Sequence, residues 1–151
     1  MKNVLKLVCV LLASLHLAGC GKEKYVLSDS VDNVAKIEIL YVHSNADVFV
    51  EELQMMEPVI VIDETNHDLF LKEFLDLPCI RQGMDHVEAI AYNTVKITYT
   101  DGSVEWICHY DSLYYNAETE QRKWKHYYFN KEIWVAFVSQ YLQNDSENPT
   151  G

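Results

Sequence analysis

The chain has 151 residues, of which 12 are Lys or Arg and 23 are Asp or Glu, so its formal net charge at pH 7 is −11. This length is sufficient for one domain with its own hydrophobic core. The excess of acidic residues argues against binding to the phosphate backbone of a nucleic acid. Solubility explains this acidity, and a basic partner is the alternative.

The first residues have the layout of a secretion leader. Lys2 and Lys6 place positive charge in front of an apolar run from Leu7 to Leu17. This run is too short to span a bilayer stably, and it closes on small residues as signal peptides do. We therefore expect residues 1–19 to form a leader that is removed.

A cysteine follows the apolar run at once, in the stretch Leu17-Ala18-Gly19-Cys20. This stretch resembles the lipobox of bacterial lipoproteins. The resemblance implies a diacylglyceryl group on Cys20, cleavage just before it, and a protein held by its lipid on a membrane of the cell envelope. Gly21 in place of Asp is compatible with the outer membrane or cell surface of a Gram-negative host. The alternative is a secreted, soluble protein with Cys20 free.

Loss of the leader would leave an even more acidic domain. Two of the 12 basic residues lie in the leader, so ten would face 23 acidic ones, a formal charge of −13. Residues 20–33 lack hydrophobic periodicity and are expected to be a lipidated Cys and a flexible tether. Residues 34–143 should form a single domain, and residues 144–151, which contain no apolar side chain, a disordered tail.

The first half of the domain contains strand patterns followed by a helix. Residues 35–42 alternate in polarity, and Val48–Val50 resumes this pattern after a turn-rich segment, which predicts a hairpin. The apolar run Val59–Ile62 predicts a strand covered on both faces. Thr65 and Asp68 approximate a capping box at the start of a helix that ends before Pro78.

The dipeptide Asp101-Gly102 predicts a two-residue hairpin turn of type I′. Such a turn pairs Tyr99 with Val104 and places Trp106 and Cys108 on the same face as Tyr99. With a further aromatic strand over residues 124–129, the segment 87–129 should form a three-strand meander.

The last predicted element is a helix that begins after Asn130, a good N-cap residue. Phe129 and Trp134 have the spacing of a hydrophobic staple. The order of elements indicates an α+β fold, with an antiparallel sheet of about five to six strands and two helices packed on one side.

Motifs for catalysis or metal binding are absent from the sequence. The histidines are scattered without metal-ligand spacing, so we predict neither a metal nor a cofactor. The acidic pairs Glu51-Glu52 and Glu118-x-Glu120 are expected to be solvated and not catalytic. We therefore expect the protein not to be an enzyme.

Cys79 and Cys108 are the two thiols that remain after Cys20. Outside the cytoplasm they could form a disulfide, or they could be buried as small hydrophobic groups. A catalytic role is a third interpretation, but Cys108 is expected to point into the core, where a thiol is inert.

An aromatic group is the remaining functional indication. Tyr114, Tyr115 and Trp124 flank the polar loop 116–123 and could form a platform for an envelope protein, peptide or glycan. The alternative is ordinary packing of aromatic side chains on a sheet. The sequence thus favours a noncatalytic binding module, or an inhibitor or immunity protein, and the alternative is an envelope hydrolase with an unrecognised acid-base site.

Overall fold

The computed structural model describes residues 23–43, 50–83 and 88–147. The expected leader, Cys20 and the start of the predicted strand at Val48 lie outside the described residues. Within the described part of the chain, none of the helices is both long and apolar enough to cross a membrane.

A six-stranded antiparallel sheet forms the centre of the domain, in the order β3-β2-β5-β6-β7-β8. Its strands are β2 (Val34–Val42), β3 (Ile60–Val61), β5 (Tyr92–Tyr99), β6 (Val104–Ile107), β7 (Ser112–Tyr115) and β8 (Arg122–Lys125). The strands from β5 to β8 are neighbours in sequence and in space, as hairpin connections require. A meander is therefore present, but its third strand is β7, and the single strand predicted over residues 124–129 is instead divided between β8 and a strand of a second sheet.

A smaller sheet of three antiparallel strands, in the order β1-β4-β9, adjoins the main sheet. It consists of β1 (Glu23–Lys24), β4 (Pro78–Arg81) and β9 (Tyr127–Phe129). One residue, His126, separates β8 from β9, so the chain passes directly from the large sheet into the small one. This passage forms one side of the candidate site described below.

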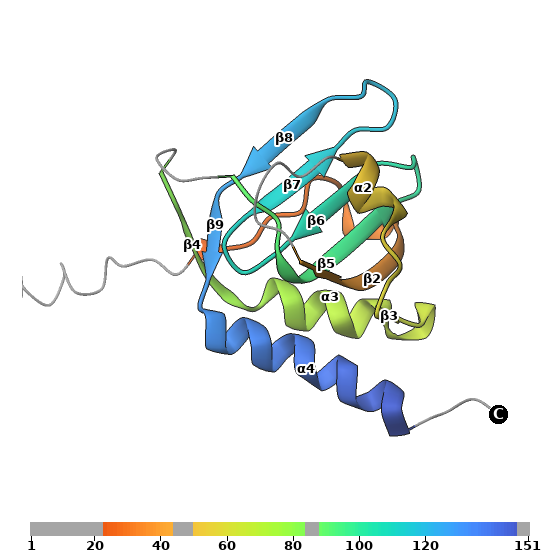
Figure 1. Cartoon of the computed structure of the whole chain (residues 1–151), viewed down its shortest axis with the longest axis vertical. Helices are drawn as coiled ribbons and strands as arrows, with labels where there is room; N and C mark the ends of the chain where they lie inside the picture. The colour runs from red at the N-terminus through yellow and green to blue at the C-terminus, as the bar shows by residue number, and fades with distance from the viewer. Residues whose placement is uncertain (1–22, 44–49, 84–87, 148–151) are drawn as a thin grey trace, which may run out of the picture.

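Two helices, α3 (His67–Leu75) and α4 (Lys131–Glu147), lie side by side over one face of the main sheet (Figure 1). Phe70 of α3 contacts Phe137 of α4, with 5.2 Å between ring centroids, and both are buried in the larger hydrophobic cluster. The short helix α2 (Val50–Met55) buries Val50 and Leu53 in a second cluster with Leu40 and Trp106. The predicted α+β fold is confirmed, and α2 supplements the two predicted helices.

The start of α4 agrees with the prediction in detail. Asn130 Oδ1 accepts hydrogen bonds from the backbone N–H groups of Glu132 (2.9 Å) and Ile133 (3.2 Å). The rings of Phe129 and Trp134 lie 5.0 Å apart, which is the predicted staple contact. The helix continues to Glu147, beyond the expected domain boundary at Gln143.

Three local predictions are wrong in the first half of the domain. Val50 begins α2 and is not part of a strand. Val59 and Val61 are exposed because β3 lies at the edge of the sheet with only one side covered, whereas Ile60 and Ile62 are buried. The helix at 65–77 begins as a 3-10 turn, η2 (Glu64–Asn66), whose N-cap is Asp63, and the capping box predicted at Thr65 does not form.

The register of the β5–β6 hairpin also differs from the prediction. Thr98, and not Tyr99, pairs with Val104, and Ile97 pairs with Glu105. Gly102 has φ +84°, and Tyr99 N donates to Ser103 O, so the loop has three residues and ends in a left-handed glycine. A shift of one residue exchanges the two faces of β6, and it moves Glu105 to the face that the long helices cover.

The segment that was expected to form a tether is docked on the domain from Glu23 onward. β1 pairs with β4, and Tyr25 is 3% exposed in the larger cluster, where its ring lies 4.9 Å from that of Tyr127. A second 3-10 turn, η1 (Val31–Asn33), precedes β2. An aromatic side chain and two backbone pairings therefore attach this segment to the core.

Candidate functional site

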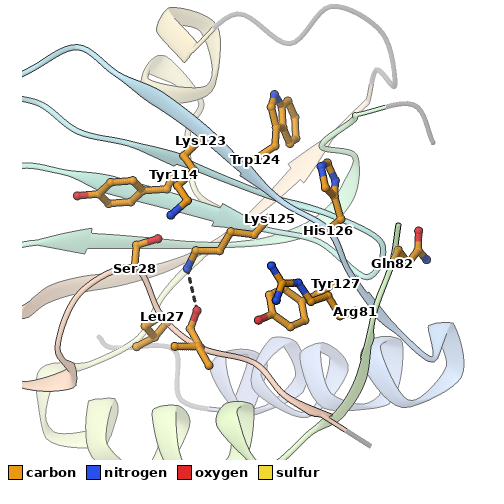
Figure 2. A pocket seen from close by; sticks show the side chains of 11 residues that line it. Leu27, Ser28, Arg81, Gln82, Tyr114, Lys123, Trp124, Lys125, His126 and Tyr127 are labelled. Carbon is orange, nitrogen blue, oxygen red and sulfur yellow. Dashed lines mark hydrogen bonds between the residues drawn. The ribbon is translucent and has the colours of Figure 1, made fainter. Parts of the chain in front are cut away.

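A groove with a volume of about 520 Å³ lies where the docked N-terminal segment, the end of β4 and strands β8 and β9 meet (Figure 2). Aromatic and basic side chains predominate in its walls. It is lined by Val26, Leu27, Ser28, Arg81, Gln82, Tyr114, Lys123, Trp124, Lys125, His126 and Tyr127. Such a combination of apolar surface with a few convergent polar groups is typical of ligand sites.

A buried carboxylate, that of Glu105, lies beneath the groove. It is fully buried and accepts hydrogen bonds from the hydroxyl groups of Tyr25 (2.6 Å) and Tyr99 (2.6 Å). Ser28 donates both its backbone N–H (2.9 Å) and its hydroxyl (3.0 Å), and Lys125 Nζ donates over 2.8 Å. A buried charge is tolerated in a protein when it is compensated in this way.

Lys125 connects this carboxylate to the groove. Its Nζ also donates to Val26 O over 2.7 Å, the bond drawn in Figure 2, and lies 5.3 Å from the centre of the Tyr25 ring. Burial lowers the pKa of Lys125, the charge of Glu105 opposes that effect, and the neighbouring Lys123 cation reinforces it. The network thus fixes the N-terminal segment as one wall of the groove.

Burial also governs the tyrosines of the network. It raises the pKa of Tyr25 well above its ordinary value of 10.0, and the charge of Glu105 adds to the effect. The same two causes raise the pKa of Tyr99. Both phenols are therefore hydrogen-bond donors at physiological pH and not proton carriers, which makes this network structural.

A second buried carboxylate, that of Asp111, orients a histidine at the wall of the groove. Asp111 Oδ1 lies 3.1 Å from His126 Nδ1, and its Oδ2 accepts from the backbone N–H of Ala89 (3.2 Å). On the other side of the ring, His126 Nε2 lies 3.8 Å from Glu88 Oε1. A carboxylate that holds an imidazole is also found in general-base sites, where a nucleophile lies beside the histidine.

The thiol of Cys108 and the hydroxyl of Ser112, which are close to Asp111 in sequence, form hydrogen bonds in the core. Cys108 Sγ donates to Ala89 O over 3.7 Å, and burial raises the pKa of Cys108. Ser112 Oγ is fully buried and lies 2.7 Å from the Tyr25 hydroxyl and 3.3 Å from Lys125 O. Neither geometry provides an exposed, activated nucleophile beside His126.

The basic side chains of the groove fall into two classes. Lys125 is neutralised by Glu105, and His126 lies against Asp111. By contrast, none of the ion pairs among the described residues involves Arg81 or Lys123. Both side chains are exposed, so the groove has a net positive rim in a strongly acidic protein.

The aromatic residues of the predicted platform are distributed over two faces of the sheet. Tyr114 pairs with Lys123, and Trp124 pairs with Leu113 on the opposite face, which Tyr115 shares. Tyr114 and Trp124 both contribute to the lining of the groove, and all three side chains are half-buried. Their role in binding stays a prediction.

The other predicted candidates lie away from the groove. Cys79 and Cys108 are free, buried thiols in different hydrophobic clusters, and burial raises the pKa of Cys79 to about 11. The acidic pairs at 51–52 and 118–120 are exposed. In the part of the chain that the structure describes, no group of three His, Cys, Asp or Glu residues is arranged to hold a metal ion.

Sequence reasoning missed both buried carboxylates and the histidine. The β7–β8 pairing contains a signal for Asp111 and His126. Because Ser112 pairs with Lys125, Asp111 and His126 lie opposite each other one step beyond the end of this ladder. Glu105 was assigned to the polar face because the predicted hairpin register was shifted by one residue.

Comparison of the chain with protein-family models, with curated protein sequences and with solved structures found no match.

Proposed function

We propose that this protein is a lipid-anchored bacterial envelope protein whose domain is a noncatalytic binding module for an anionic ligand. The observation that carries the proposal is the groove, where Arg81 and Lys123 have no ion-pair partner among the described residues and pair across the strands with the aromatic residues Tyr127 and Tyr114, respectively. An unneutralised positive rim in an acidic domain favours an anion, and aromatic walls add contact area for the group that bears it.

The anchor would be the lipid on Cys20, which lies three residues before Glu23, the first residue of β1. Intact-mass measurement of protein from the membrane fraction tests this part. We expect a chain that begins at Cys20 and carries acyl mass, and a Cys20→Ser variant without that mass. A mature chain with an unmodified Cys20 would contradict the anchor and would leave a secreted domain.

Isothermal titration calorimetry tests the groove. The probes are glycerol phosphate, an acidic peptide and an acidic oligosaccharide. We expect at least one to bind the wild type. Binding should be weakened by about 1–3 kcal/mol in Tyr114→Ala, because Tyr114 lines the groove on the face that carries Lys123.

Tyr41→Ala is the matched control, because Tyr41 is an exposed aromatic residue of β2 and is not part of the groove lining. Its binding should equal that of the wild type. If no anionic probe binds, or if both variants lose binding equally, the groove is not the ligand site.

A second candidate function is hydrolysis, and the Asp111–His126 pair is the observation that favours it. A histidine held by a carboxylate could activate a water molecule at the groove. Incubation of the same peptide and oligosaccharide probes with the wild type and with His126→Asn distinguishes the two functions. Cleavage by the wild type alone would replace the binding module with a hydrolase, and intact probes would retain it.

A further inference from the structure

We propose that the anion held at the positive rim of the groove is the phosphate of an anionic phospholipid headgroup, so that the domain rests with this groove against the leaflet that holds its anchor. This inference depends on the proposed lipid at Cys20 and names the ligand of the proposed binding site.

The register of the small sheet places the anchor near the rim. Glu23 pairs with Cys79 and Lys24 with Pro78, so the chain enters β1 from the end of β4 at which Arg81 lies. Cys20 precedes Glu23 by three positions, and an extended chain over this interval reaches about 10 Å. A lipid on Cys20 would therefore keep this end of β4 close to the headgroups.

One exposed apolar side chain borders the groove: Val26 is 64% exposed. The exposed side chains of Ile80 and Tyr128 lie on the other face of the small sheet from Arg81 and Tyr127, and they are not part of the groove. Tyrosine and tryptophan favour the level of the headgroups, and exposed aliphatic groups gain contact there.

The chemistry of the rim suits a phosphodiester. Arg81 offers a planar fork of donors and Lys123 a mobile point charge, and both are free of the ion pairs that occupy Lys125 and His126. Figure 2 shows Arg81 beside Tyr127 at the end of the groove where the side chain of Gln82 also lies. Two unneutralised cations exceed the single negative charge of a phosphodiester.

The net negative charge of the domain repels an anionic leaflet, but this repulsion acts only over a short distance. At physiological ionic strength the Debye length is about 8 Å, so acidic residues on the far side of the domain are screened. The exposed cations that touch the surface then dominate, since each basic residue close to an anionic leaflet contributes favourably.

The test uses the lipidated full-length protein in vesicles of phosphatidylcholine, alone or mixed equally with phosphatidylglycerol, that carry a nitroxide quencher on some headgroups. The reporter is a tryptophan introduced by Val26→Trp in a Trp124→Phe background, because Val26 is 64% exposed and lines the groove, whereas Trp106 and Trp134 are fully buried. We expect strong quenching in the phosphatidylglycerol vesicles and weak quenching in phosphatidylcholine.

The variant Arg81→Gln/Lys123→Gln should lower the docked-to-undocked ratio about 30-fold in phosphatidylglycerol, as expected for the loss of two basic residues at such a surface. The variant Lys72→Gln/Lys131→Gln is the control, because these exposed lysines belong to α3 and α4. It should be quenched like the wild type. All four positions are exposed, so equal melting temperatures should establish that both variants fold.

The outcomes separate the two proposals. If Cys20 carries acyl mass and the introduced tryptophan is quenched no more in phosphatidylglycerol than in phosphatidylcholine, the headgroup inference is wrong and the anchor stands. If glycerol phosphate in solution alters the emission of the introduced tryptophan while the vesicles do not, the groove takes a soluble phosphate. If both double variants lose quenching equally, attraction is diffuse and the groove is not the site.

Discussion

Replacement of Glu105 by glutamine would test whether the buried carboxylate holds the N-terminal segment in place. Five hydrogen bonds converge on its two oxygens, with donor–acceptor distances from 2.6 to 3.0 Å. A glutamine has only one accepting oxygen. Tyr99 can reorient its hydroxyl group, but the backbone N–H of Ser28 would then face an N–H₂ group and lose its acceptor.

The expected loss of stability follows from two effects. An unsatisfied buried donor costs about 1–3 kcal/mol, and Lys125, whose side chain is only 14% exposed, loses its counter-ion. Removal of one partner from a buried pair typically costs about 3–5 kcal/mol, which we take as the total. For a domain of this size about 1 kcal/mol corresponds to about 4 °C, so the melting temperature should fall by about 12–20 °C.

The measurement is thermal and urea unfolding followed by circular dichroism, with Glu51→Gln as the control. Glu51 forms an exposed pair with Arg122 (3.3 Å), and its loss should cost at most about 1 kcal/mol. Trypsin gives a local readout, because cleavage after Lys24 should accelerate in Glu105→Gln when the segment undocks. If Glu105→Gln is as stable as Glu51→Gln, or if cleavage after Lys24 is unchanged, the network does not hold the segment.

Three further predictions concern other parts of the domain. Asn130→Ala should destabilise the protein by about 0.5–2 kcal/mol in urea unfolding, because it removes the side-chain cap of α4; an unchanged midpoint would contradict this. Burial lowers the pKa of His109 below 6.5, so the unfolded chain binds this proton first as pH falls. Stability should decline from about pH 6.5 downward, less steeply in His109→Gln, and parallel pH profiles would refute the assignment. Cys79 and Cys108 should react with a thiol reagent only on unfolding, and non-reducing peptide mapping that joins them would show the reasoning to be wrong.

Local sequence patterns were sufficient for the elements whose signals lie within a few residues. Asn130 and its neighbours Phe129 and Trp134 predicted the start of α4 because a cap and a staple involve contacts within one turn. Alternation over residues 35–42 predicted β2, whose buried Ile37 and Ile39 face the long helices. The order of these elements indicated the α+β class, since amphipathic helices must cover an apolar sheet face.

Tertiary structure alone decided where the polar groups of the groove would lie. Tyr25 and Glu105 meet across 80 residues, and no periodicity within either segment contains that contact. The hairpin at Gly102 supplied the decisive detail, because a three-residue loop and a two-residue loop suit the same dipeptide but present opposite faces of β6. The burial of Glu105 on the face of Tyr25 and Tyr99 follows from that register, which depends on the long-range packing of β6 against the rest of the core.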